Sequence, residues 1–393
     1  MMVNEFHPPA RILMGPGPSN VDPRVTMAMA KPLLGHLDPD FLQIMNKIQA
    51  LLQYVFGTKN ALTLPVSGTG SAGMEAAFVN VVEPGDRVLV CVHGYFGERM
   101  VEIATRCGAN LRTLSATWGE PLDREEIEKE LRAFQPRVLA LVHAETSTGV
   151  LQPLEELSQV LKKFPDTLLL ADTVTSLGGH PVKVDDWGID ACYSGTQKCL
   201  GCPPGLAPVT FSPKALERIK ARKQKVLSFY LDAEILGKYW GNERAYHHTA
   251  SSSLNYALLE ALRIIEEEGL ERRYERHRRN HLALVRGVEA MGLQMLVKEP
   301  YRLWSLNTIR IPDGIDDLKV RKTLLEENNL EIGGGLGKLK GKIWRVGLMG
   351  YGSNQTHVLY FLTALEQALR EQGFEVPRGA GAAAAREFYA KNK

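Results

Sequence analysis

The sequence predicts an α/β protein with a large domain built on a mostly parallel, doubly wound sheet and a small C-terminal α+β domain. Short, continuously apolar runs alternate with amphipathic stretches over roughly residues 67–212. Strands that are buried on both faces read as unbroken apolar runs, and the helices between them cover those faces. After Ser251 the alternation stops, and long helical patterns with single strand-like runs replace it.

Four apolar runs are the predicted strands of the large domain. They read RVLVCV, RVLALVHA, TLLLAD and LAPVTF, and they begin at Arg87, Arg137, Thr167 and Leu206. Polar, helix-like segments such as DREEIEKELRAF and PLEELSQVLKKF lie between several of them. Strands that alternate with helical patterns predict a parallel sheet joined by helical crossovers.

The second half of the chain predicts the smaller domain. One or two long helices with a bend near Gly269 precede a strand-like NTIRIP, a helix, a strand-like KIWRVGLMG and a last long helix. The end, GAGAAAAREFYAKNK, is either a loose tail or a short helix. We therefore divide the chain into an N-terminal segment (1–20), a large domain (21–265), a small domain (266–375) and a tail (376–393).

Composition excludes several functional classes. Hydrophobic residues make up 44% of the chain and charged residues 23%, with a net charge of +2, so no nucleic-acid footprint is indicated. The main basic cluster, ERRYERHRRN, interleaves acids with bases and predicts a solvated helix face. No apolar run reaches the ~18 residues that span a bilayer, so we expect no membrane. Five cysteines, an odd number, are no disulfide scaffold, and we expect a cytoplasmic protein.

A glycine-rich turn in PVSGTGSAGMEAAFVNVV is the first candidate site. The free N–H groups and the positive dipole end of a helix start favour a phosphate, and glycines let the backbone approach it closely. Thr69, Gly70 and Ser71 would be the contacts. The other interpretation is an ordinary strand-to-helix turn, because the motif matches neither the dinucleotide fingerprint nor the P-loop.

An aspartate and a lysine follow at successive predicted strand ends. Asp172 closes the apolar run LLLAD, and Lys198 lies 26 residues later in SGTQKCL. Ligands of open α/β sheets bind at the carboxyl ends of the strands. Asp172 either caps the next segment or pairs with the protonated ring nitrogen of pyridoxal phosphate. Lys198 is either a solvated lysine or a nucleophile that binds a carbonyl cofactor when its amine is neutral and desolvated.

Arg345 stands within the apolar, strand-like run IWRVGLMG. A buried arginine must be paired, and its planar fork suits a carboxylate. Both a structural salt bridge with an Asp or Glu and the α-carboxylate of a substrate fit this pattern equally well.

Two short motifs contain residue types that can bind metals, but their spacing argues against a metal site. Cys199-x-x-Cys202 has no second CxxC to complete a structural zinc site, so packing cysteines are the favoured interpretation. The adjacent histidines in YHHT, residues 246–249, cannot face one ligand together on a strand or a helix. A polar loop that lines a cleft is the better interpretation, and we predict no metal site.

In combination, these motifs resemble the class V aminotransferases of fold type I, and within them the alanine–glyoxylate and serine–glyoxylate group. The resemblance covers about Leu13 to Gly373 and is carried by GPGPSN, GHLDPDF, SGTGSAGMEA, ETSTGVLQP, ADTVTSLGG, SGTQKCL, YHHT and WRVGLMG. It implies a pyridoxal 5'-phosphate cofactor, small amino acids and 2-keto acids as substrates, and a homodimer with two sites at its interface.

The resemblance also implies roles for individual residues. Lys198 would form the Schiff base with the cofactor and move the proton, and Asp172 would bind the pyridine nitrogen. Arg345 would hold the substrate carboxylate, with Gly17 and its neighbours at the substrate mouth. The remaining cofactor contacts would be Thr69, Gly70, Ser71 and Gln197 at the phosphate, Thr146 at the ring hydroxyl, Phe96 stacked on the ring, and Tyr246 and Thr249 lent to the neighbouring subunit.

The reaction implied is transamination from alanine, or from serine, to glyoxylate. Cysteine desulfurases share the fold but need a mobile cysteine downstream of the lysine, and no cysteine follows Cys202. The ureidoglycine–glyoxylate branch of purine breakdown is a closer alternative. Its members are expected to line the substrate pocket with amides where this chain has His36 and Tyr246, which favours alanine or serine. A catalytically inactive scaffold is disfavoured because Lys198, Asp172 and Arg345 are all present.

Overall fold

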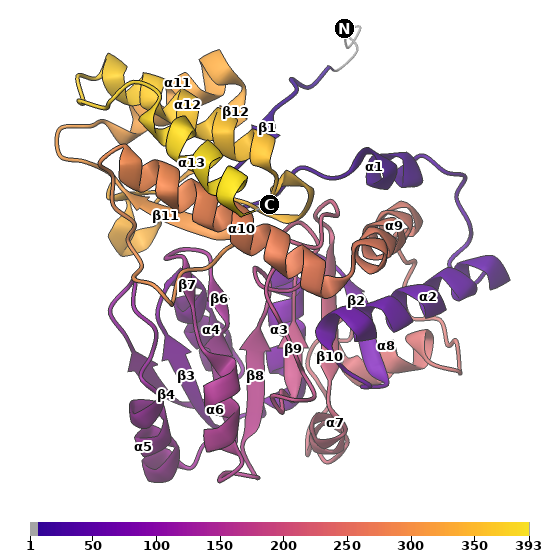
Figure 1. Cartoon of the computed structure of the whole chain (residues 1–393). Coiled ribbons are helices and arrows are strands. Elements are labelled where there is room, and N and C mark those ends of the chain that lie inside the picture. Colours follow the sequence, from indigo (N-terminus) through magenta and orange to yellow (C-terminus); the bar gives the residue numbers. More distant parts are fainter. Residues whose placement is uncertain (1–6, 393) are drawn as a thin grey trace, which may run out of the picture.

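The computed structural model describes residues 7–392, which form two domains around separate hydrophobic cores (Figure 1). The larger core draws on buried side chains from Val25 to Ile265. The smaller core combines Met14 with side chains between Ala283 and Tyr389. No helix in the described part of the chain is long and apolar enough to cross a membrane.

A seven-stranded sheet forms the centre of the large domain. Its strand order is β2-β10-β9-β8-β5-β3-β4, and only β10 runs antiparallel to its neighbours. The strands are β2 (Leu62–Ser67), β3 (Arg87–Val92), β4 (Asn110–Ser115), β5 (Val138–Val142), β8 (Leu168–Asp172), β9 (Ala191–Tyr193) and β10 (Leu206–Phe211). All the parallel strands therefore end at the same edge, which is the edge that carries the site.

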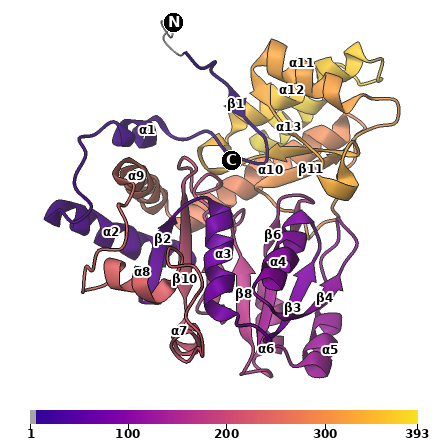
Figure 2. The same cartoon turned by 180° about the vertical axis from the view of Figure 1, so that it is seen from behind.

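Helices cover both faces of this sheet. The helices α3 and α4 lie on the face nearer the viewer in Figure 2, whereas α6 and α10 lie on the face nearer the viewer in Figure 1. The helices of the large domain are α1 (Pro23–Met29), α2 (Pro39–Phe56), α3 (Gly70–Val81), α4 (Tyr95–Arg106), α5 (Arg124–Phe134), α6 (Leu154–Leu161), α7 (Pro213–Lys220), α8 (Ala233–Trp240) and α9 (Ser252–Glu268).

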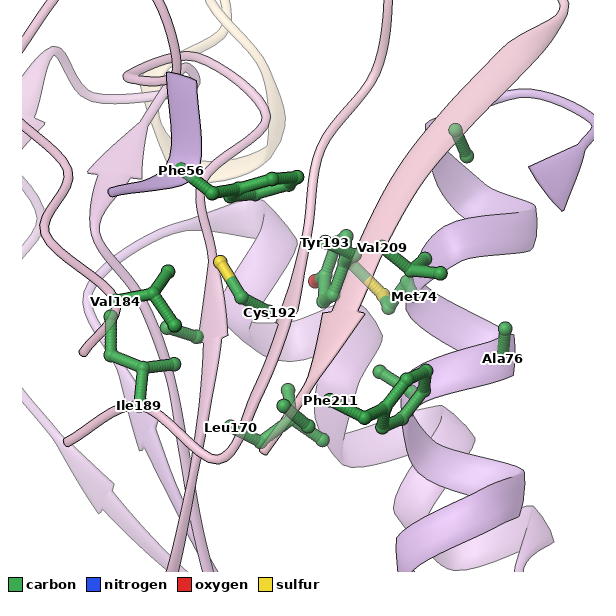
Figure 3. Packing of buried hydrophobic residues seen from close by; sticks show 14 of the residues in the cluster. Phe56, Met74, Ala76, Leu170, Val184, Ile189, Cys192, Tyr193, Val209 and Phe211 are labelled. Atoms are coloured by element: carbon green, nitrogen blue, oxygen red, sulfur yellow. The ribbon is translucent and has the colours of Figure 1, made fainter. Parts of the chain in front are cut away.

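Side chains alternate across the sheet and fill two core layers. Cys192 of β9 points toward Phe56 and Val184, whereas its neighbour Tyr193 points toward Met74 of α3 (Figure 3). Successive residues of a strand point to opposite faces, so one short strand contributes to both layers. The predicted continuous apolar runs are confirmed here, because β5 and β8 are buried along their whole length.

Besides the four predicted runs and the predicted strand before Lys198, the sheet has two strands that the sequence-based prediction lacks. The edge strand β4 is polar and largely exposed, and it pairs only with β3. The strand β2 leads into the glycine-rich turn, which is the predicted phosphate site, and lies at the other edge of the sheet. The polar β4 needs no continuous apolar run because part of its surface stays in water, whereas β2 is buried at five of its six positions.

The small domain is built on an antiparallel sheet with helices packed against it. Its strands β11 (Leu306–Arg310), β14 (Ile343–Gly347) and β13 (Gly333–Gly334) form one sheet, and β12 (Leu330–Glu331) pairs with the N-terminal β1 (Ile12–Leu13). Two short strands, β6 (Ala144–Glu145) and β7 (Val150–Leu151), form a separate hairpin. The helices of the small domain are α10 (Leu270–Ala290), α11 (Asp317–Asn328), α12 (Gln355–Glu371) and α13 (Ala380–Lys391).

The domain junction and the C-terminus refine the expected divisions. The bend is at Gly269, whose φ of 78° ends α9 and starts α10. The residues set apart as a tail instead form α13, and Val376, Ala385 and Tyr389 are part of the small-domain core. These residues therefore belong structurally to the small domain. The N-terminal segment also joins that domain, through β1 and the buried Met14.

Candidate active site

Lys198 lies in the loop that follows β9, and its side chain is only 8% exposed. The amine donates a hydrogen bond to the carbonyl of Pro16. Gly17 packs directly against it, since a Cβ on Gly17 would lie 2.6 Å from the lysine Nζ. Burial, followed by the positive charge of Arg345, lowers the pKa of Lys198 to about 8. The N-terminal segment thus desolvates the amine, which is the condition that makes a lysine nucleophilic.

Asp172 is the last residue of β8 and is almost completely buried. It stands opposite Tyr193 of the parallel strand β9, whose hydroxyl donates to Asp172 Oδ2 at 2.7 Å, and the backbone N–H of Val174 donates to Oδ1 at 2.8 Å. Burial raises the pKa of Asp172 to about 6, against the effect of these hydrogen bonds. The carboxyl group is therefore mostly ionised at neutral pH and can pair with a protonated ring nitrogen.

The turn after β2 forms the start of α3. Thr69 is the N-cap residue, but its side chain makes no capping hydrogen bond in the described structure. The first N–H groups of a helix have no partner within the helix, so this end can accept an anion. Gln197, next to Lys198, has a buried side-chain oxygen with no hydrogen-bond partner in the described chain; an amide oxygen accepts, so this atom is open to a donor and not to a phosphate oxygen.

These groups line one cavity. Eight of the residues singled out from the sequence line it: Thr69, Gly70, Ser71, Phe96, Thr146, Asp172, Gln197 and Lys198. The cavity combines an anion-binding helix start, a buried carboxylate, an aromatic ring and a desolvated amine. This set of groups fits pyridoxal phosphate, which presents a phosphate, a ring nitrogen, a flat ring and an aldehyde.

Arg345 reaches this region from β14 of the small domain. Its Nε donates to the carbonyl of Gly334 at 2.7 Å and its Nη1 to the carbonyl of Thr146 at 3.3 Å. Within residues 7–392 no carboxylate lies within ion-pair distance of the guanidinium, so the structural salt bridge considered above is not formed. Burial lowers the pKa of Arg345 to about 10, while the negative charge of Glu145 opposes that shift. The guanidinium stays charged and available for an anionic ligand.

Three of the residues singled out from the sequence lie elsewhere in the chain. The rings of His36 and Tyr246 are 5.2 Å apart, and Tyr246 is 62% exposed. Thr249 is exposed in the same loop. None of the three lines the cavity around Lys198. Their neighbour His248 does reach the start of the phosphate turn, through a 2.9 Å contact with Ser67 Oγ.

Sequence reasoning missed several residues of the cavity. Tyr193 and Val174 both hydrogen-bond Asp172, and the pairing of neighbouring strand ends was a signal that could have found Tyr193. Arg99 lies on α4 three residues after Phe96, which is the spacing that places two side chains on one helix face. Met74, Val142 and Ala144 complete the wall, but nothing distinguishes them in sequence from ordinary core residues.

The cysteine motif is part of the packing. Cys199 and Cys202 are buried free thiols, and Cys199 Sγ lies 3.4 Å from the carbonyl oxygen of Thr175. No cluster of three or more potential metal ligands occurs among the described residues.

Comparison with known proteins identifies the family of the chain. The family model described as aminotransferase class-V matches residues 15–338. The chain is 40% identical to the (S)-ureidoglycine–glyoxylate transaminase of Bacillus subtilis, over 98% of this chain and 97% of that protein. It is 41% identical to the alanine–glyoxylate aminotransferase of Drosophila melanogaster, over 92% and 93% of the two chains.

Solved structures show the same relationship. The alanine–glyoxylate aminotransferase from Nostoc sp. superposes with a TM-score of 0.93 at 52% identity, covering 94% of this chain and 98% of that one. The ureidoglycine–glyoxylate aminotransferase from Bacillus subtilis superposes with a TM-score of 0.96 at 41% identity, covering 98% and 100%.

The fold and the site together define a pyridoxal phosphate-dependent transaminase of fold type I. The chain belongs to the class V aminotransferase family.

Proposed function

We propose that this protein transfers the amino group of alanine, with serine as an alternative donor, to glyoxylate, releasing glycine and a 2-keto acid. The observation that carries the proposal is the desolvated Lys198 in one cavity with the buried Asp172 and near the unpaired Arg345. Two relatives with more than 90% coverage, from Nostoc sp. and Drosophila melanogaster, are named alanine–glyoxylate aminotransferases.

The residues divide the chemistry among them. Bound pyridoxal phosphate supplies an aldehyde that accepts an amino group and a ring that withdraws electrons. Lys198 would hold the cofactor through its Nζ, and its free amine would carry the proton between the donor's Cα and the cofactor. Asp172 keeps the ring nitrogen protonated, and Arg345 binds the donor's carboxylate through its planar fork. With glyoxylate the same residues act in reverse order.

The donor assignment rests on two side chains outside the cavity of their own chain. His36 and Tyr246, whose rings lie 5.2 Å apart, stand where members of the ureidoglycine branch are expected to carry amides. A site built to hydrogen-bond a polar group strongly favours the substrate that carries it. Without those amides, the preference is for a small donor such as alanine or serine.

Ureidoglycine remains the second candidate donor, because the Bacillus subtilis relative with that name matches 98% of this chain. Half-reactions separate the candidates. Purified protein loaded with cofactor would be mixed with L-alanine, L-serine or ureidoglycine without a keto acid, and loss of the visible cofactor band would be followed. We expect alanine or serine to bleach the band and glyoxylate to restore it. Bleaching by ureidoglycine alone would overturn the donor assignment.

We further propose a homodimer in which Tyr246 and Thr249 serve the neighbouring subunit's site. Both residues are exposed in the single chain and lie outside its cavity. Exposed apolar side chains occur in the loop that carries Tyr246, on either side of His36, and in the segment before α8. Exposed apolar patches of this kind mark interfaces. These side chains are Leu33, Leu37, Leu227, Phe229, Tyr230 and Tyr246.

Hybrid dimers test this shared site. Lys198→Ala and Tyr246→Phe/Thr249→Ala chains would each be inactive alone, but the hybrid contains one site with an intact Lys198 and an intact partner loop. Random re-association of equal amounts should restore about a quarter of wild-type activity, because half of the dimers are hybrids and each has one working site. Mixing that restores nothing, with dimers verified by light scattering, would contradict site sharing.

We also propose a cytoplasmic location for this protein, which the five free thiols fit.

A further inference from the structure

Arg99 lies in the cavity with no role assigned by the site described so far. Its Nη1 donates to Ser71 Oγ at 3.1 Å, which joins α4 to the phosphate turn at the start of α3. Its guanidinium carbon lies 5.0 Å from the ring centroid of Phe96 and 5.5 Å from that of Tyr95. Arg99 therefore stands where the predicted phosphate contacts meet the predicted stacking ring.

The predicted phosphate contacts supply no positive charge to balance a bound phosphate. Thr69, Gly70, Ser71 and Gln197 are all uncharged, whereas a phosphate monoester carries about −1.5 to −2 charges at neutral pH. The other cation that lines the cavity is Lys198, whose amine is occupied by the aldehyde in the loaded enzyme. In the described chain no carboxylate lies within ion-pair distance of Arg99, so its charge is not neutralised by the protein.

Helix geometry fixes the guanidinium in position. Residues three and four apart share a helix face, so Phe96 and Tyr95 both lie beneath the Arg99 side chain. The stacked rings restrict a long side chain that is otherwise flexible, which lowers the entropy cost of binding an anion. A guanidinium can also offer two parallel N–H groups to one phosphate.

We propose that Arg99 is a further cofactor-binding residue, whose guanidinium pairs with the phosphate of pyridoxal phosphate beside Ser71. The helix start of α3 supplies neutral donors, and Arg99 supplies the positive charge that they lack.

Comparing two forms of the cofactor tests this assignment. Cofactor-free wild type, Arg99→Gln and Arg99→Lys would be titrated with pyridoxal 5'-phosphate and with pyridoxal, which lacks the phosphate, by tryptophan fluorescence and absorbance. We expect Arg99→Gln to lose about 10- to 100-fold in affinity for pyridoxal 5'-phosphate and to bind pyridoxal as wild type does. Arg99→Lys should recover part of the loss, because it keeps the charge but not the fork.

A matched control lies on the same helix. Arg106 pairs with Glu102 at 2.7 Å in the exposed last turn of α4, so Arg106→Gln should leave both affinities unchanged. Equal losses for both compounds in Arg99→Gln would assign Arg99 to ring placement alone and overturn the proposal. Unchanged affinity for pyridoxal 5'-phosphate would also overturn it. No amino donor is present, so the result is independent of the proposed donor and acceptor.

Discussion

At the scale of single residues, the reactivity of Lys198 depends on its burial. Its pKa is lowered to about 8, and only the neutral amine attacks an aldehyde. The neutral fraction grows as pH rises through about 8 and falls below it. We expect the rate at which cofactor-free protein captures pyridoxal phosphate to rise roughly tenfold from pH 6.5 to 7.5 and to level off above pH 8.5.

Stopped-flow absorbance from pH 6 to 9.5 measures this rate. Lys198→Ala is the control, because it keeps the cavity and removes the amine. A capture rate that stays flat across this range would show that the amine is not the titrating group. A rate that still rises tenfold per pH unit up to pH 9.5 would show that Lys198 keeps the pKa of a solvated lysine in the cofactor-free protein.

Arg345 is the second residue whose role can be separated from the cofactor. Its Nε and Nη1 are held by the carbonyls of Gly334 and Thr146, which orient the fork for a carboxylate. Arg345→Lys keeps the charge but loses the paired donors, so the KM for the amino donor should rise about 10-fold or more. Affinity for pyridoxal phosphate, measured by titration without substrate, should change less than about threefold. A donor KM equal to that of wild type would make Arg345 a purely structural residue.

At the scale of elements, helix α4 depends on a carboxylate from another segment. Its N-cap residue Gly94 has no side chain to cap it. The buried Glu145 instead accepts from the N–H groups of Phe96 at 3.2 Å and Gly97 at 3.4 Å, and from Ser147 Oγ at 2.7 Å. A Cβ on Gly94 would lie 2.3 Å from Glu145 Cγ. Glu145 therefore ties the hairpin that carries Thr146 to the helix that carries Phe96.

The ionisation of Glu145 gives this link a pH dependence. Burial raises the pKa of Glu145 to about 7, above its ordinary value, so the folded state favours the protonated form. Its contribution to stability is complete below about pH 4.5 and is lost as pH rises through 7. Glu145→Gln cannot ionise and lacks this loss. The unfolding free energy of wild type minus that of Glu145→Gln should fall by about 2–3 kcal/mol between pH 5 and 8.

Urea titrations of both proteins at several pH values in that range test the link. Gly94→Ala provides an independent perturbation, because its methyl group displaces the same carboxylate without changing its charge. It should weaken cofactor binding at every pH. A difference in unfolding free energy that does not vary with pH would mean that Glu145 keeps one protonation state throughout.

At the scale of the whole molecule, the buried Arg273 connects the two domains to the loop that carries Lys198. Arg273 of α10 pairs with Glu268 of α9 at 2.7 Å. It also donates to the carbonyl of Gly178 at 2.9 Å and to that of Cys199, the residue after Lys198, at 2.7 Å. The junction at Gly269 and the catalytic loop are therefore held by one guanidinium.

Removing Arg273 should affect both stability and the site. Arg273→Ala leaves the carbonyls of Gly178 and Cys199 without this donor, whereas Glu268 keeps its ion pair with Arg276. The free energy of unfolding should therefore fall by about 2–5 kcal/mol, the cost of two buried carbonyls left unsatisfied. Arg278, which pairs with Glu275 on the exposed face of the same helix, is the control, and Arg278→Ala should cost less than about 1 kcal/mol. Denaturant unfolding of the cofactor-free proteins measures both values. Equal losses of unfolding free energy in Arg273→Ala and Arg278→Ala would show that Arg273 does not hold the domain junction and the Lys198 loop together.

Much of the lining of the candidate site could be predicted from the sequence. The parallel strands placed Asp172 and Lys198 at one sheet edge, and the glycine-rich turn placed Thr69 to Ser71 beside them; the structure brings all of these to one cavity. Periodicity cannot place side chains that reach the site from elsewhere in the chain. Arg99, Tyr193 and Glu145 have no motif of their own, and they become part of the site only through packing against Ser71, Asp172 and α4.

The sequence by itself determined the strand–helix order, the fold class and the identity of the lysine and aspartate, because these follow from local periodicity and from motifs along the chain. Only the tertiary structure decided that Pro16 and Gly17 cover Lys198. It also decided that Arg345 has no carboxylate partner among the described residues. It placed three residues outside the cavity of their own chain: His36, Tyr246 and Thr249. Burial, pKa and charge pairing depend on distances between segments that are remote in sequence, and packing alone sets those distances.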